Sequence, residues 1–213
     1  MGKKNVEKKS KVVAKPAKKK SGVKNQGHEF RCLPKIVAQI FIYLKDHPDK
    51  RALVDEMSFG ALSFFPNKYL NQRLLKQIFD HYDIYDNTIY LDAAAVNITM
   101  EIIGNALGLS SKGTPYDTRV VKKELSQEDR DVHKFFQGKT TVTLQDLIKT
   151  TPLAIDTNMN KKLFMRSFIL FVQKIFLLPN SMANITPIAL PTIFYLENTS
   201  NRNWALHVHN FLL

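Results

Sequence analysis

One long apolar stretch, residues 163–178, does most to limit what the chain can fold into. It is shorter than the roughly 20 residues that a membrane-spanning helix needs. Its polar side chains repeat at a spacing of seven and would form one narrow stripe along a helix. We therefore expect a central core helix over residues 160–178 and no membrane span. The stripe would be the solvent-exposed edge of that helix, and its members are Arg166, Ser167, Gln173 and Lys174.

Aromatic residues on the same helix admit two interpretations, a ligand-binding surface or core packing. Core packing is the commoner meaning of aromatic side chains on a helix that is apolar almost all round. We therefore expect the core to contain Phe164, Phe168, Phe171 and Phe176.

Hydrophobic periodicity predicts that most of the remaining chain is helical. Three helices are expected in the first part of the folded region, one opening at Pro34, one over residues 48–57 and one over residues 68–80. The third helix would direct Leu74 and Ile78 towards the core.

Signals for helix ends and turns locate further elements. Gly108 is the expected left-handed end of a helix that Asn97 caps. Ser126 and Thr143 each stand three residues before an Asp, a pattern typical of a capping box, and each predicts a short helix. Two β-rich runs within residues 82–91 predict a hairpin. The fold class is therefore mainly α, a multi-helix globular domain with one small β-hairpin.

The positive charge is concentrated at the N-terminus. The chain has a net charge of +12, and residues 1–27 hold ten lysines, one glutamate and no aromatic residue. Such a segment buries too little apolar surface to fold, so we expect a disordered basic arm before a nearly neutral domain over residues 28–213.

The lysine clusters of this arm are typical of nuclear import signals and of tails that contact phosphate backbones without reading bases. A purely solubilising tail is the alternative interpretation. The expected partners are an import receptor and, non-specifically, nucleic acid. The residues expected to make these contacts are Lys8, Lys9, Lys15, Lys18, Lys19 and Lys20.

Residues that could suggest catalysis or metal binding have simpler explanations. The single cysteine, Cys32, is expected to pack as a small hydrophobe. His207 and His209 stand two apart on an expected final helix, so their rings diverge, and we expect both on the surface. The acidic cluster from Asp80 to Asp86 lies at a helix end and a turn, where Asp is favoured for backbone reasons. We assign no catalytic, cofactor-binding or metal-binding residue.

Four short motifs follow one another in an order that carries a family resemblance. Over about residues 30–213 the chain resembles a helical region of uncharacterised plant proteins linked to transposons. That region is related to the aminotransferase-like plant mobile domain and often precedes a SUMO-type cysteine protease domain. Many members carry Gly where this chain has Ser58. The motifs are Arg31-Cys32-Leu33-Pro34, Val54-x-x-Met57-Ser58-Phe59-Gly60-Ala61-Leu62, Leu107-Gly108-Leu109 and Asn203-Trp204-Ala205.

The resemblance implies a nuclear, transposon-derived region without enzymatic activity or cofactor. We expect a non-catalytic protein that binds protein or nucleic acid through its helical domain. The alternative is an accessory region or remnant of a SUMO-type cysteine protease that lacks the catalytic domain. The final helix, expected from Asn203, has no stop signal after Phe211, which predicts that the helical region is truncated at residue 213.

Overall fold

The computed structural model describes residues 32–137, 142–149 and 154–212. Within these residues most of the regular structure is α-helical, which confirms the mainly α class. The arm predicted for residues 1–27 lies outside the described residues. The α-helices are α1 (Pro34–Lys45), α2 (Pro48–Glu56), α3 (Gln72–Phe79), α4 (Met100–Leu107), α5 (Gln127–Phe136), α6 (Leu144–Lys149), α7 (Asn158–Val172) and α8 (Trp204–Leu212).

Shorter elements connect these helices. Three 3₁₀ helices are η1 (Gly60–Phe64), η3 (Pro191–Phe194) and η4 (Leu196–Asn201), and one π-helical turn, η2 (Gln173–Leu177), extends α7. The strands are β1 (Tyr82–Asp83), β2 (Thr88–Leu91) and β3 (Ala94–Asn97). No helix in the described part of the chain is long and apolar enough to cross a membrane.

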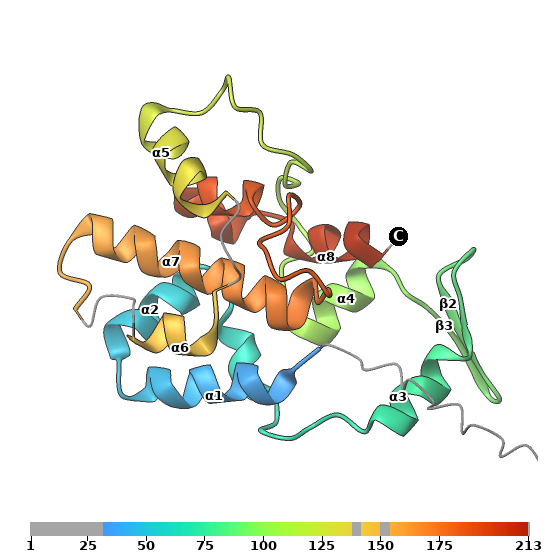
Figure 1. The fold of residues 1–213 in the computed structure, drawn as a ribbon. Helices are drawn as coiled ribbons and strands as arrows, with labels where there is room; N and C mark the ends of the chain where they lie inside the picture. The colour runs from blue at the N-terminus through green and yellow to red at the C-terminus, as the bar shows by residue number, and fades with distance from the viewer. Residues whose placement is uncertain (1–31, 138–141, 150–153, 213) are drawn as a thin grey trace, which may run out of the picture.

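Helix α7 lies at the centre of the bundle, with α2, α6, η3 and η4 packed around it (Figure 1). All four phenylalanines that we placed in the core are buried, which confirms that prediction. The predicted solvent-exposed edge is wrong, because Arg166, Ser167 and Gln173 are buried too. Residues of η3 cover that side of the helix, and Arg166 and Gln173 bond to Ile193 and Thr192 there.

The last helix closes the core through a tryptophan. Trp204 is fully buried, and its ring lies 4.8 Å from that of Phe59 and 4.7 Å from that of Tyr116, centroid to centroid. Helix α8 packs against α4, where Gly104 allows a close approach to Ala205. Asn203 caps α8, as predicted, by accepting a hydrogen bond from the Leu206 amide at 2.8 Å.

The other predicted helix ends are largely confirmed. Ser126 caps α5 and Gly108 ends α4 with a φ of 63°. Thr143 bonds to the Asp146 amide at the start of α6. The cap of α4 is Thr99, not Asn97, because Asn97 belongs to the third strand.

The predicted hairpin is a three-stranded antiparallel sheet in the order β1-β2-β3. The third strand was not predicted, because three of its four residues are Ala94, Ala95 and Asn97, which have low strand propensity. Helix α3 begins at Gln72 rather than near residue 68, since Asn71 caps it. Its predicted burial in the core is wrong, because no residue of α3 is buried.

Candidate functional site

A cavity of about 540 Å³ opens between α5 and α7. A hollow of about 240 Å³ adjoins it towards η4 and shares Glu128, Lys162 and Arg166 with it. We call the two together the α5–α7 groove. The wall of the larger part is mainly apolar, and its apolar side chains are Val132, Phe135, Phe136, Met159 and Leu163.

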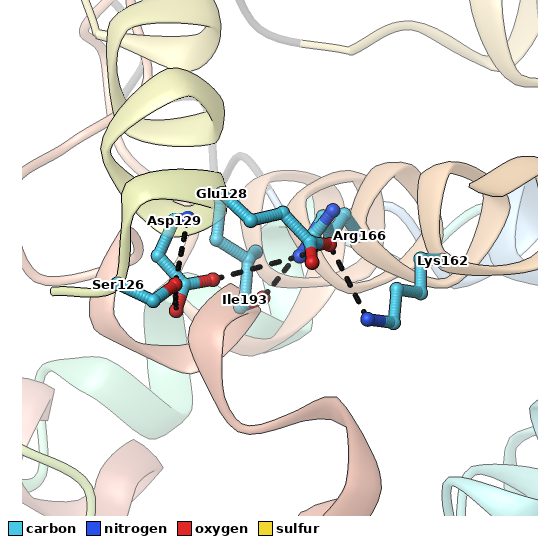
Figure 2. A network of polar contacts seen from close by, with 6 residues as sticks. All are labelled: Ser126, Glu128, Asp129, Lys162, Arg166 and Ile193. Atoms are coloured by element: carbon cyan, nitrogen blue, oxygen red, sulfur yellow. Dashed lines mark hydrogen bonds and ion pairs between the residues drawn. The ribbon is translucent and has the colours of Figure 1, made fainter.

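A network of charged side chains lies where the two parts of the groove meet (Figure 2). Arg166 is at its centre, with one guanidinium nitrogen 3.7 Å from a carboxylate oxygen of Glu128 and 3.7 Å from one of Asp129. These separations are ion pairs but exceed hydrogen-bond length. The Arg166 Nε donates a hydrogen bond to the Ile193 carbonyl at 3.4 Å. The Lys162 ammonium lies 3.3 Å from Glu128.

The predicted N-cap of α5 fixes one of the carboxylates in this network. The Ser126 hydroxyl accepts from the Asp129 amide at 3.1 Å and donates to the Asp129 carboxylate at 2.7 Å. This exchange holds the Asp129 side chain in the first turn of α5, where it faces Arg166 (Figure 2). The Asp129 carboxylate therefore both holds the capping hydroxyl of Ser126 and balances the charge of Arg166.

Burial sets the electrostatics of Arg166. Loss of solvation lowers the pKa of its guanidinium, while Glu128 and Asp129 oppose that shift. Since arginine starts from a very high pKa, it stays charged at neutral pH and needs its two carboxylates. The groove thus has a fixed, neutralised ion cluster at its middle and apolar walls on one side.

The lysines predicted as import or nucleic-acid contacts lie outside the described residues. Cys32 packs against the core and its thiol donates to the Phe176 carbonyl at 3.7 Å. Burial raises the pKa of this thiol to about 11, so it is protonated at neutral pH, unlike a catalytic cysteine.

The two predicted surface histidines have different environments. The prediction is wrong for His207, which is buried and lies 3.0 Å from the side-chain oxygen of Gln173. That oxygen can only accept a hydrogen bond, so the His207 Nε2 is protonated and is the donor of this bond. Burial lowers the pKa of His207 to about 4, so the ring is neutral at pH 7. His209 is half-buried on the same helix.

The acidic cluster around the sheet serves the turns. Asp83 accepts from the Tyr85 amide at 2.8 Å and Asp86 accepts from the Thr88 amide at 3.0 Å, as expected for turn aspartates. Among the described residues, no group of three or more His, Cys, Asp or Glu side chains is placed to hold a metal ion.

The groove could not be predicted from the sequence. Its two helices are separated by a long stretch of chain, so no local spacing connects Glu128 with Lys162. One signal was present, since Arg166 stands within the long apolar stretch of residues 163–178 and a charge in such a place requires partners.

A protein-family model matches most of the chain. The family model described as "Domain of unknown function (DUF8566)" matches residues 30–213. Neither a curated protein nor a solved structure matches the chain.

Proposed function

Since the chain belongs to the DUF8566 family, whose function is not known, we propose from its own side chains that it is a non-catalytic nuclear protein that binds a protein partner. The α5–α7 groove receives an apolar, basic helical segment of that partner. The composition of the groove carries this proposal, because apolar walls adjoin more carboxylates than cations.

The charges of the groove favour a basic occupant. Four carboxylates and two cations line its two parts, and both cations already face Glu128 or Asp129. Asp131 has one distant cation, Lys134 at 3.9 Å, and the described residues show no ion pair for the exposed Glu197. A lysine or arginine of the occupant would form ion pairs with these two acids.

The shape of the groove favours a helix. Its larger, apolar part lies between two helices and adjoins the hollow beside η4, so the two parts together extend further than either one alone. An amphipathic helix places apolar residues at spacings of three and four along one face, which suits such a depression. Phe135 and Met159 are well exposed there and would form the first contacts.

The experiment is selection of peptides from a displayed library of random helical sequences on the full chain. We expect selected peptides to carry apolar residues at helical spacing with flanking Lys or Arg. Phe135→Ser and Met159→Ser should each weaken their binding roughly tenfold, because each removes a large apolar contact. Met182→Ser is the matched control, since Met182 is exposed elsewhere. Selected peptides that bind all three variants equally would overturn the assignment of the groove.

The nuclear part of the proposal is supported by the lysine clusters of residues 1–27. The resemblance to transposon-linked plant proteins supports the same compartment and a transposon origin. Replacing Lys18, Lys19 and Lys20 together by Ala in a fusion too large to diffuse through nuclear pores should abolish nuclear accumulation. The same replacement of Lys122, Lys123 and Lys134 is the control. Nuclear accumulation that persists without the arm lysines would contradict this part.

A further inference from the structure

A second surface stands apart from the groove. Residues 68–97, which contain α3 and the three strands, project from the helical bundle (Figure 1). We call them the projecting unit. Within the described residues, the extensive contacts of its strands are with one another, and α3 makes no extensive contact with an element of the bundle. The cation of Lys35 on α1 lies 4.0 Å from the ring of Tyr69 near its base.

The projecting unit has a small apolar interior of its own. Tyr82, Ile89 and Val96 are paired across the three strands and therefore share one face of the sheet. All three are half-buried, and the ring of Phe79 on α3 lies 6.4 Å from that of Tyr82. Helix α3 thus lies by this face without covering it fully.

Much of the apolar surface of the unit remains exposed. Of the sixteen large hydrophobic side chains that are exposed among the described residues, seven belong to these 30 residues. So high a share in so short a segment exceeds the scattered exposure of ordinary surfaces and is typical of an interaction site. The seven are Tyr69, Leu74, Phe79, Ile84, Tyr85, Tyr90 and Leu91.

The charges of the projecting unit identify the occupant. Its basic residues, Lys68, Arg73 and Lys76, belong to α3 and the turn before it. Its acidic residues follow the helix, at the end of α3, in β1 and in both turns of the sheet, and they are Asp80, Asp83, Asp86 and Asp92. Lys76 pairs with Asp80 at 2.9 Å, whereas the described residues show no ion pair for Lys68, Arg73 or Asp92.

We propose that the projecting unit is a dimerisation surface that binds a second copy of this chain. In a two-fold pair, the basic helix of one copy faces the acidic sheet of the other, and the reverse contact forms at the same time. The exposed apolar side chains lie between them. An anionic membrane or a nucleic acid would be repelled by the sheet, and an acidic protein partner likewise.

Sedimentation of the full chain at concentrations up to about 100 µM tests the proposal. The fraction of dimer at each concentration gives the dissociation constant. We expect a concentration-dependent dimer. Leu74→Ser and Ile84→Ser should each raise the dissociation constant roughly tenfold, because each removes apolar contact area. Ile42→Ser, at an equally exposed position on α1, is the control and should leave it unchanged. Circular dichroism confirms that each variant is folded.

A charge exchange makes the test specific to this surface. Arg73→Asp and Asp92→Arg should each disrupt the dimer. In each variant residues 73 and 92 carry the same sign of charge, so the helix of one copy repels the sheet of the other. Mixing the two variants should restore a dimer of one copy of each. A chain that stays monomeric, a dimer that survives the substitutions, or variants that do not recover on mixing would each overturn the proposal. None of these outcomes bears on the groove.

Discussion

Arg166 is the buried charge on which the middle of the groove depends. Arg166→Met keeps an unbranched stem and removes the guanidinium with its charge, so Asp129 loses its cation while 27% of the Asp129 side chain is exposed. We expect the free energy of unfolding to fall by about 1–3 kcal/mol, the cost of leaving a partly buried polar group without its partner. Urea unfolding at pH 7 measures the change.

Lys162→Met is the matched control for that substitution. Lys162 pairs with Glu128, whose side chain is 61% exposed and remains solvated without the lysine. Exposed pairs contribute little, so the loss should stay below about 1 kcal/mol. Equal losses in the two variants would show that the position of Arg166 has no special role.

Ser58 adopts a backbone conformation that suits glycine better. Its φ of 65° lies in the left-handed region, at the end of α2. Since L side chains are strained there, Ser58→Gly should raise the free energy of unfolding by about 0.5–1 kcal/mol after the entropy of the more flexible unfolded chain is included. Ser63→Gly, inside the 3₁₀ helix η1, is the control and should lower stability. A loss of stability at both positions would contradict the prediction.

Single residues also mark where sequence reasoning succeeds. Ser126, Gly108 and Asn203 were assigned correctly, because a cap acts within a few residues of itself. His207 and Gln173 were placed on the surface although they bond to each other inside the core. Their partners come from distant parts of the chain, and a polar side chain gives no local sign that such a partner exists.

Helix α4 can end where it does only because Gly108 has no side chain. Its φ is 63°, and an added Cβ would lie 2.2 Å from the Cβ of Ala61. Gly108→Ala combines backbone strain with overpacking, so we expect a loss of about 2–4 kcal/mol in thermal or urea unfolding.

Gly60→Ala supplies the comparison for Gly108→Ala. An added Cβ at residue 60 would meet the carboxylate of Asp55, at 2.5 Å, and this side chain can move away. The expected loss is below about 1 kcal/mol, in the range of ordinary surface changes. A loss at Gly60 as large as that at Gly108 would mean that the close approach to Ala61 does not matter.

The elements that were mispredicted are those that tertiary contacts decide. Helix α3 has a strongly amphipathic sequence, and the core was the obvious place for its apolar face, yet it lies by the small sheet. The end of α7 was expected as regular helix, but Leu178 bonds to the Gln173 carbonyl five residues back, which makes η2 a π-helical turn. Turns of this kind occur where a specific contact requires them, and here Gln173 reaches both Thr192 and His207.

At the scale of the whole molecule, His207 makes stability depend on pH. Its pKa is about 4 in the folded protein and near 6.5 in an unfolded chain, so the unfolded state binds more protons between these values. Acidification from pH 7 to pH 4 therefore removes stability, on the order of 3 kcal/mol from this group. Other acids titrate over part of the same range, which makes a comparison with a variant necessary.

His207→Gln removes the titrating ring and keeps a group that can bond to Gln173. The variant should be less stable than the natural chain at pH 7, and the difference should shrink as the pH falls to 4. Urea unfolding at several pH values measures both curves. Parallel curves would show that His207 does not take up a proton on unfolding.

More of the overall architecture than of the candidate site could be predicted from the sequence. Mainly helical class and a central apolar helix follow from periodicity within one segment. The groove depends on α5 lying beside α7, and the projecting unit on α3 failing to reach the core, and neither relation is encoded in local spacing.

During synthesis on a ribosome, Phe59 and Tyr116 emerge long before Trp204, the side chain that fills the space between them. Helix α4 is likewise synthesised about a hundred residues before α8, the helix against which it packs. The growing chain therefore carries an unfinished apolar centre for most of its translation, and such intermediates are prone to aggregate. Its yield in a cell should depend on holding chaperones that protect the nascent chain until the final helix has left the ribosome.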